Sequence, residues 1–268
     1  HVLSSYLDSD LPVAVSEYTR QLVIAAAEEI DARHATHFAD RCRMRIAVSY
    51  PAVNTGAYLG LHPRKVAERL ATRGLTPGRY VLYLSRLAHA KGVDDVITGF
   101  AQSSGCADQS LVIAGDGPQS AELRALAREG PAGDRILFFD DVNDEEKPHL
   151  MAGCAAFVLP SKPRPEFVET FGIALVEKML AGGGPVITTE TGGIGEAVGD
   201  TALFVPTSSP AAIAAALDHA ISMPDSDRAR MAKRARSHAL QFDRIEVFDR
   251  LLARMPSTQE RRLTPAGG

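Results

Sequence analysis

Residues 80–92 read Tyr-Val-Leu-Tyr-Leu-Ser-Arg-Leu-Ala-His-Ala-Lys-Gly, a nearly continuous apolar run followed at once by a short polar loop. The run Ala-Phe-Val-Leu at 156–159 has the same character. Strands of this composition are buried on both faces, as they are in parallel sheets that carry helices on each side. Residues 80–84 therefore predict a central strand of a parallel sheet, with polar groups directly after its carboxyl end.

Short apolar runs alternate with helical patterns from Arg79 onward. The expected strands are Tyr80–Leu84, Ser110–Ala114, Ile136–Phe139, Ala155–Leu159, Pro185–Thr188 and Ala202–Val205, and the expected helices lie near 91–104, 119–129, 144–152, 170–182 and 209–222. Strands that alternate with helices form right-handed βαβ units, and these units build a parallel sheet. We therefore expect an α/β domain with a doubly wound, Rossmann-like sheet.

The first sixty residues have a different organisation. A strand is expected at 12–16, a helix at Glu17–Asp31 and another strand at 45–50, which are too few elements for a complete sheet. We interpret residues 1–60 as the end of a preceding domain with a linker and residues 61–240 as the Rossmann-like domain. Residues 241–268 are expected to form a C-terminal crossing helix and a disordered polar tail.

Composition limits the classes of partner. A formal charge of −4 and a pI near 6.1 give no electrostatic reason to expect binding to nucleic-acid polymers, and no apolar run reaches membrane-spanning length. Three scattered cysteines form neither a metal-ligand pair nor a disulfide framework, which favours a reducing cytoplasm and predicts no metal site. The basic residues of one late helix are interpreted as its solvated face: Arg228, Arg230, Lys233, Arg234 and Arg236.

Polar or glycine-rich motifs follow four of the expected strands. They are Arg86 and Lys91 after the first strand, 115–118 (Gly-Asp-Gly-Pro) after the second, Ser161 and Glu169 after the fourth, and 189–193 (Thr-Glu-Thr-Gly-Gly) after the fifth. Ligands of open α/β sheets bind outside the carboxyl ends of the strands. Because all these motifs fall at such ends, we expect them to share one ligand site at that edge.

Two glutamates eight positions apart, Glu169 and Glu177, begin and end the segment Glu-Thr-Phe-Gly-Ile-Ala-Leu-Val-Glu. If the intervening residues are helical, a rise of ~1.5 Å per residue separates the carboxylates by roughly 12 Å. The N–H groups of Phe171, Gly172 and Ile173 would lie between them at a helix N-terminus, which favours a diphosphate. For either glutamate alone, a solvated helix-end carboxylate is the alternative.

Cations and glycines at the same edge suit phosphate. The guanidinium of Arg86 and the ammonium of Lys91 match the oxygens of a diphosphate, although ordinary surface charge is the alternative for each. Gly192 and Gly193 could cradle phosphate through backbone N–H groups, and Gly115 could allow close approach of a nucleotide or simply form a turn. Neither glycine motif has the third glycine of the dinucleotide fingerprint, which disfavours NAD.

Taken in order, these motifs resemble the nucleotide-sugar-binding half of glycosyltransferase family 4, whose members are retaining enzymes with the two-domain GT-B fold. The segments that carry the resemblance are Val13–Arg20, Ser49–Asn54, Tyr83–Gly92, Leu111–Pro118, Pro160-Ser161, Glu169–Glu177 and Val186–Gly193. The similarity covers roughly residues 10–222. One departure is Asp140, which stands where the family has glycine near the expected nucleobase pocket.

The resemblance implies roles for individual residues. Arg86 and Lys91 would hold the diphosphate, Glu169 would accept hydrogen bonds from hydroxyls of the donor sugar, and Glu177 from the ribose hydroxyls. Backbone at Phe171 and the residue after it would contact the sugar and phosphates. It also implies a UDP-sugar donor carrying a hexose or N-acetylhexosamine, transfer with retained anomeric configuration, and no metal or other cofactor.

The sequence leaves open which acceptor is used and whether the chain alone forms a complete enzyme. Ala/Arg-rich composition and the segments 49–54 and 191–194 are similar to those of enzymes that glycosylate 2-deoxystreptamine in antibiotic biosynthesis, and other small molecules or glycans are alternatives. Most of the acceptor-binding N-terminal domain is missing, so either a longer chain or a partner chain would supply it. The isolated chain is expected to bind donor and transfer poorly. The alternatives are a non-catalytic sugar-nucleotide-binding subunit and an unrelated Rossmann-like domain.

Overall fold

A computed structural model describes residues 2–255, and the tail for which disorder is predicted lies outside the described residues from 256 onward. The chain divides into two compact units. The larger is Val53–Gln241, and the smaller takes its described residues from His1–Ala52 and Phe242–Gly268. In this division, residues 53–60 belong to the larger unit, whereas the sequence analysis assigned them to the preceding domain and linker. The helix after residue 242 belongs to the smaller unit.

The larger unit is built on a six-stranded sheet in the order β5-β4-β3-β6-β7-β8, in which every neighbouring pair is parallel. The strands are β3 (Tyr80–Leu84), β4 (Ser110–Ala114), β5 (Ile136–Phe139), β6 (Ala156–Leu159), β7 (Val186–Thr188) and β8 (Leu203–Phe204). Each was predicted within one residue at either end. The predicted α/β fold with a doubly wound parallel sheet is therefore confirmed.

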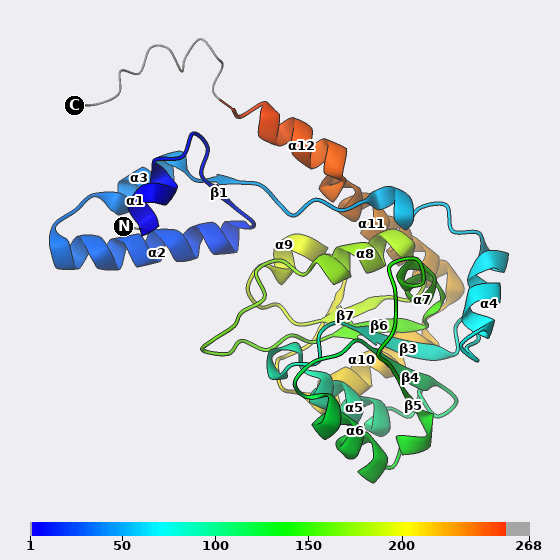
Figure 1. The fold of residues 1–268 in the computed structure, drawn as a ribbon. Coiled ribbons are helices and arrows are strands. Elements are labelled where there is room, and N and C mark those ends of the chain that lie inside the picture. The colour runs from blue at the N-terminus through cyan, green and yellow to red at the C-terminus, as the bar shows by residue number, and fades with distance from the viewer. Residues whose placement is uncertain (1, 256–268) are drawn as a thin grey trace. The chain divides into compact units, whose positions relative to one another are not determined.

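Helices cover both faces of this sheet (Figure 1). One layer contains α5 (Val93–Gln102), α6 (Ser120–Glu129) and α10 (Pro210–Ser222); the other contains α7 (Lys147–Gly153), α8 (Ile173–Ala181), α9 (Ile194–Val198) and α11 (Asp225–Ala239). Helix α4 (Pro63–Ala71), which packs against α7, and the short α9 were not predicted. Central strand residues such as Val81, Leu111 and Phe157 have no exposed surface, which explains why their sequence is apolar on both faces.

The direction of sheet growth reverses between β3 and β6. The chain passes from β3 to β4 to β5 at one edge and then returns to place β6 on the other side of β3. The carboxyl ends of β3 and β6 are therefore the point at which the strand order reverses, which is where open α/β sheets bind ligands.

The smaller unit contains one parallel strand pair and four helices among its described residues. These are β1 (Val13–Ala14), β2 (Ala47–Val48), α1 (Val2–Leu7), α2 (Glu17–His34), α3 (Phe38–Arg45) and α12 (Arg244–Leu252). Leu7, Ile24 and Cys42 are buried in its core. The strands are shorter and α2 is longer than predicted, and α1 and α3 were not predicted. Within residues 2–255, no helix combines the length and the apolarity that crossing a membrane would require.

Candidate functional site

Lys91, in the segment after β3, and Glu169, in the segment after β6, form an ion pair at the carboxyl edge of the sheet. Their side chains are only 15% and 12% exposed, so the pair is largely withdrawn from solvent. The ammonium of Lys91 also lies 4.9 Å from the centre of the Phe167 ring. The structure thus brings together two residues that the sequence predicted to share a site.

The loop that carries Lys91 is fixed by a lysine that the sequence analysis missed. The backbone N–H of Lys162 donates to the carbonyl of Ala90 at 2.8 Å. Its side chain, 6% exposed, forms ion pairs of 2.9 Å with Asp94 and Asp95 at the start of α5. These contacts join the loop after β6 to the loop after β3, so they stabilise the position of Lys91.

Arg86 lies on the same edge of the sheet but is exposed, and its side chain has no hydrogen-bond or ion-pair partner within the described part of the chain. Gly115, directly after β4, allows close contact with the loop that carries Arg86. A Cβ at Gly115, where φ is +129°, would lie 2.2 Å from the carbonyl oxygen of Ser85, so only glycine permits this contact. The N–H of Leu87 donates to the carbonyl of Asp116 at 3.0 Å, which completes the junction of the two loops.

Gly192 and Gly193 support the backbone of Glu169. A Cβ on Gly192 would lie 2.0 Å from the carbonyl oxygen of Glu169, and one on Gly193 would lie 2.0 Å from that of Thr170. The N–H of Gly193 donates to the Glu169 carbonyl at 2.9 Å. This corrects the prediction of a phosphate cradle in part, because the Gly193 N–H already has a backbone acceptor and the pair packs against the segment that carries Glu169.

Helix α8 begins at Ile173, later than predicted, with Gly172 as its N-cap at φ +94°. Phe171 is buried, and the side chain of Ile173 is 45% exposed. The estimate of roughly 12 Å along one helix axis is therefore wrong, because the residues from Glu169 to Gly172 are not helical and Glu177 lies only one turn into α8. The Ile173 N–H still belongs to the first turn, whose N–H groups have no acceptor within the helix.

Glu177 is held by two residues that the sequence analysis did not identify. Its Oε1 accepts hydrogen bonds from the Tyr58 hydroxyl at 2.6 Å and from Lys147 Nζ at 2.9 Å. Burial and the neighbouring Glu177 raise the pKa of Tyr58, which keeps the phenol protonated as a donor. Lys147 is the first residue of α7, the helix that follows the third predicted strand, so its position at the carboxyl edge could have been recognised from the sequence. Tyr58 lies in an irregular segment, where no pattern in the sequence indicates its position.

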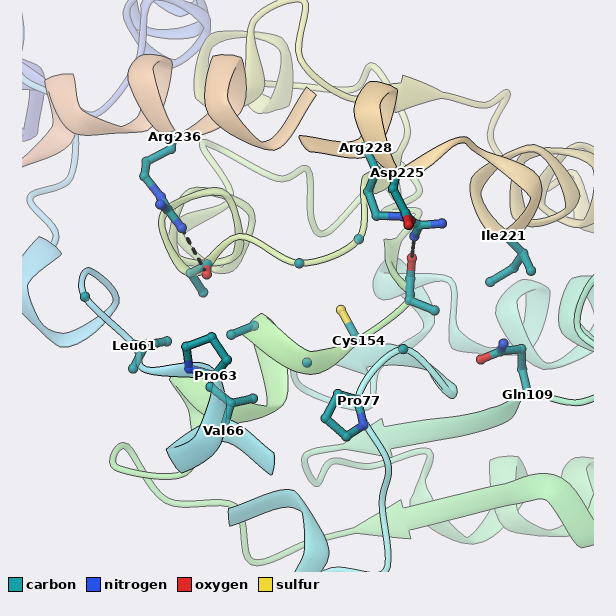
Figure 2. A pocket seen from close by; sticks show the side chains of 18 residues that line it. Leu61, Pro63, Val66, Pro77, Gln109, Cys154, Ile221, Asp225, Arg228 and Arg236 are labelled. Carbon is teal, nitrogen blue, oxygen red and sulfur yellow. Dashed lines mark hydrogen bonds between the residues drawn. The ribbon is translucent and has the colours of Figure 1, made fainter. Parts of the chain in front are cut away.

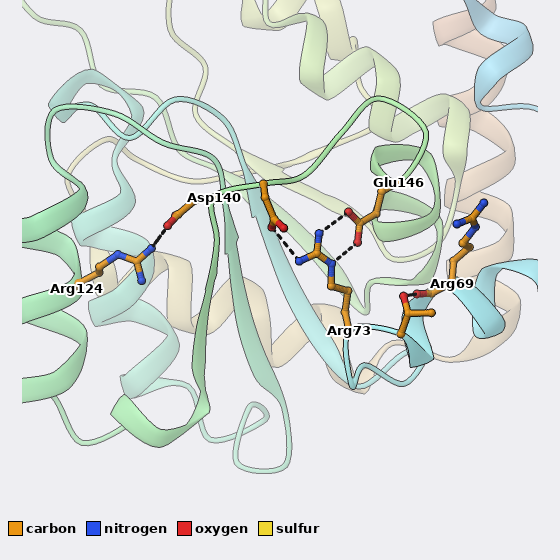
Figure 3. A network of polar contacts seen from close by, with 7 residues as sticks. Arg69, Arg73, Arg124, Asp140 and Glu146 are labelled. Carbon is orange, nitrogen blue, oxygen red and sulfur yellow. Dashed lines mark hydrogen bonds and ion pairs between the residues drawn. The ribbon is translucent and has the colours of Figure 1, made fainter.

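The loop between β5 and α7 is fixed by two arginines (Figure 3). Arg73 donates to both carboxylate oxygens of Glu146 at 2.6 and 2.8 Å, and to Asp141 at 2.8 Å. Arg124 of α6 pairs with Asp140 at 2.6 Å, so the residue that departs from the family pattern directs its carboxylate toward α6. Because Glu146 immediately precedes α7, its ion pair with Arg73 also stabilises the position of the start of that helix.

A doubly wound parallel sheet with paired charges at its switch point has the architecture of α/β domains that bind ligands at that edge. The family model described as "Glycosyl transferases group 1" matches residues 72–238. The chain belongs to this family, and the resemblance predicted from the motifs is confirmed.

Two curated relatives and one solved structure illustrate the similarity. The 2-deoxystreptamine glucosyltransferase of Streptomyces kanamyceticus is 32% identical over 136 residues, which are 49% of this chain and 34% of that protein. The GDP-mannose-dependent alpha-(1-6)-phosphatidylinositol dimannoside mannosyltransferase of Mycobacterium tuberculosis is 32% identical over 176 residues, 65% of this chain and 44% of that protein. These matches span a third to less than half of each relative.

HepE of Anabaena, solved in complex with UDP and glucose, has the same fold with a TM-score of 0.75 at 22% identity. The match covers 94% of this chain and 65% of that one.

Proposed function

We propose that this chain is the donor-binding part of a retaining glycosyltransferase that moves a hexose or N-acetylhexosamine from a UDP-sugar to an acceptor hydroxyl. The observation that carries this proposal is the pairing of Lys91 with Glu169 at the switch point of a sheet that belongs to the glycosyl transferases group 1 family. A cation and a hydrogen-bond acceptor stand side by side there, as binding of a sugar diphosphate requires.

Each charged group would have a distinct partner in the donor. The ammonium of Lys91 and the exposed guanidinium of Arg86 would bind the diphosphate, and the Ile173 N–H in the first turn of α8 would add a backbone donor. Glu169 would accept hydrogen bonds from the sugar. Since Oε1 of Glu177 already accepts two hydrogen bonds, its Oε2 would be left to accept from the ribose hydroxyls.

The transfer itself needs no protein nucleophile. The acceptor oxygen attacks the anomeric carbon on the face that the diphosphate leaves, the bond from that carbon to the diphosphate breaks, and a phosphate oxygen takes the acceptor proton. Lys91 and Arg86 oppose the charge that grows on the leaving diphosphate, so they act most strongly in the transition state. We propose that no metal ion takes part.

The choice of UDP as donor rests on similarity and has a specific competitor. UDP is supported by the shared fold with HepE, which was solved with UDP and glucose. GDP-mannose is the second candidate, because a mannosyltransferase that depends on it aligns with 65% of this chain. For the acceptor we propose 2-deoxystreptamine, supported by the similarity to a glucosyltransferase of that name.

Further residues, on this chain's own continuation or on a partner chain, would bind the acceptor. We also propose a reducing cytoplasm as the location, supported by Cys42, Cys106 and Cys154, which are all free and buried.

Calorimetric titration of the chain with UDP-glucose, UDP-N-acetylglucosamine, GDP-mannose and NAD tests the proposal. We expect one UDP-sugar to bind and Glu177→Ala to abolish that binding, whereas Glu145→Ala, an exposed carboxylate on the loop before α7, leaves it unchanged. If the chain binds GDP-mannose more tightly, the nucleobase and the sugar of the proposed donor would change, whereas the proposed class of reaction, sugar transfer from a nucleotide sugar, would not. Binding of NAD alone would refute the proposal. Sugar transfer once the acceptor-binding residues are supplied would separate an enzyme from a non-catalytic binding subunit.

A further inference from the structure

A cavity of about 610 Å³ lies at the amino ends of the strands (Figure 2). Lys91 and Glu169 lie at the opposite, carboxyl edge of the same sheet. Its wall includes Gly78 just before β3, Gln109 just before β4 and Ala155 just before β6. The volume falls within the range of about 300–1,000 Å³ that is typical of small-molecule sites. Nothing in the proposed transfer reaction uses this end of the sheet.

Two arginines of α11 turn into this cavity rather than toward solvent. Arg228 donates to the carbonyl of Ala155 at 3.1 Å, and Arg236 donates through Nε to that of Leu180 at 2.9 Å. The late helix therefore does not have the uniformly solvated basic face that its sequence predicted. Arg230, on the same helix, does remain exposed.

Neither inward arginine has a carboxylate partner among the described residues. A guanidinium has five N–H donors, and Arg236 uses only Nε and Nη2, which leaves both donors of Nη1 available. Asp225 lines the same cavity but is exposed and forms no ion pair with either arginine. Lys178, fully buried, does not line the cavity, and its Nζ donates to the carbonyl of Gly182. Burial, and to a smaller extent the two arginines, lower the pKa of Lys178, which disfavours a further cation there.

Gln109 supplies an independent sign of a missing ligand. The residue is 6% exposed, and its Oε1 has no hydrogen-bond partner within the described chain. Its side chain extends from the sheet toward the cavity in Figure 2. A buried polar atom of this kind is normally satisfied. Because less than 1 Å² of Oε1 is accessible, a donor on a bound molecule would reach it only once the Gln109 amide turns into the cavity.

We propose that this cavity binds a small hydroxylated organic anion. The phosphate or carboxylate group meets the unused Nη1 donors of Arg236, and the hydroxylated carbon skeleton extends along the apolar wall at Leu61 and Pro77 toward Gln109. An inorganic ion would leave most of the volume and the apolar wall unused. Binding here does not depend on the proposed sugar transfer.

Calorimetry with three probes tests the charge requirement. Glucose 6-phosphate, gluconate and neutral glucose are titrated into the chain with UDP present in excess, so that the opposite edge is occupied. We expect at least one of the two anions to bind and glucose to bind at least tenfold more weakly; which anion binds distinguishes phosphate from carboxylate. No binding of either anion up to about 10 mM, or equal binding of glucose, overturns the proposal.

Variants locate the binding. Arg236→Gln is expected to lower the affinity for the anion at least tenfold. Arg230→Gln, which removes an exposed arginine paired with Asp227, is expected to change that affinity less than twofold. Loss of anion binding in Lys91→Ala instead would place the anion at the donor edge and refute the site.

Arg236 also binds carbonyls at the end of α8, so the variant could fail to fold. Leu61→Trp provides the only tryptophan in the chain and a reporter on the cavity wall. A saturable change in its emission with the bound anion supports the site, and unchanged emission while calorimetry records binding overturns it.

Discussion

Replacement of Gly192 by alanine tests how the loop after β7 supports Glu169. An added Cβ would lie 2.0 Å from the Glu169 carbonyl oxygen, and separations below 3.0 Å essentially never occur, so that carbonyl must move by about 1 Å. The residue also has φ +59°, a left-handed conformation that costs an L-residue roughly 1–2 kcal/mol. We therefore expect Gly192→Ala to lower the free energy of unfolding by about 2–4 kcal/mol, the conformational cost together with the displacement.

The functional effect follows from the displaced carboxylate. A misplacement of about 1 Å can cost ~10²-fold in activity, and we expect the affinity for the UDP-sugar to fall about tenfold or more, with UDP alone affected less. Urea unfolding gives the stability and calorimetry gives the affinities. Gly195→Ala is the matched control. Gly195 lies within helix α9, and its added Cβ would be 3.7 Å from the nearest atom, a side-chain oxygen of Glu190.

Alanine at position 195 should be neutral or stabilise by about 0.5–1 kcal/mol, since glycine is unfavourable inside a helix. If Gly192→Ala retained wild-type stability and donor affinity, the backbone contact between the two loops would not position Glu169. If both variants lost stability equally, the effect would belong to the loop in general and not to the Glu169 carbonyl.

Three further predictions concern charge. Arg86→Ala and Lys91→Ala should each lower turnover of the complete enzyme by ~10²–10³ with a smaller effect on donor binding, and a raised KM at unchanged kcat would contradict that assignment. Tyr58→Phe removes one of the two hydrogen bonds to Glu177, so the free energy of unfolding should fall by about 1.5–3 kcal/mol, the cost of losing a hydrogen bond to a charged group. Calorimetry should also show weaker binding of UDP because Glu177 is less well positioned, and unchanged affinity would exclude this positioning role. Burial, with help from nearby Arg69 and Lys65, lowers the pKa of His149, so the unfolded chain takes up a proton first and the free energy of unfolding should fall as pH drops below about 6.5. Urea unfolding between about pH 7.5 and about pH 5.5 should show that decline, and His149→Gln should reduce it; an equal decline in the variant would assign the effect elsewhere.

The sheet was predictable because its information is local. The central strands are buried on both faces, so their residues are mostly apolar, and the short apolar runs of all six strands were recognised within one residue at either end although the edge strands β5 and β8 are partly exposed. The convergence of Arg86, Lys91 and Glu169 on one edge followed from the rule that parallel strands present their carboxyl ends together.

Helices whose sequence patterns are weak or short were harder to predict from the sequence. Helix α9 is only five residues long, and α4 is a short amphipathic helix after an irregular segment. The start of α8 was placed too early, because Gly172 adopts a left-handed conformation that the apolar pattern does not reveal.

The sequence by itself determined the six strands of the larger unit and the class of residues at their carboxyl edge, because apolar runs reveal buried strands and the polar motifs directly follow those runs. Only the tertiary structure showed that Tyr58 and Lys147 share one oxygen of Glu177, although 119 residues separate the tyrosine from that glutamate. It alone also showed that Arg228 and Arg236 turn inward. Contacts of this kind depend on how distant segments pack, and no short stretch of sequence contains that information.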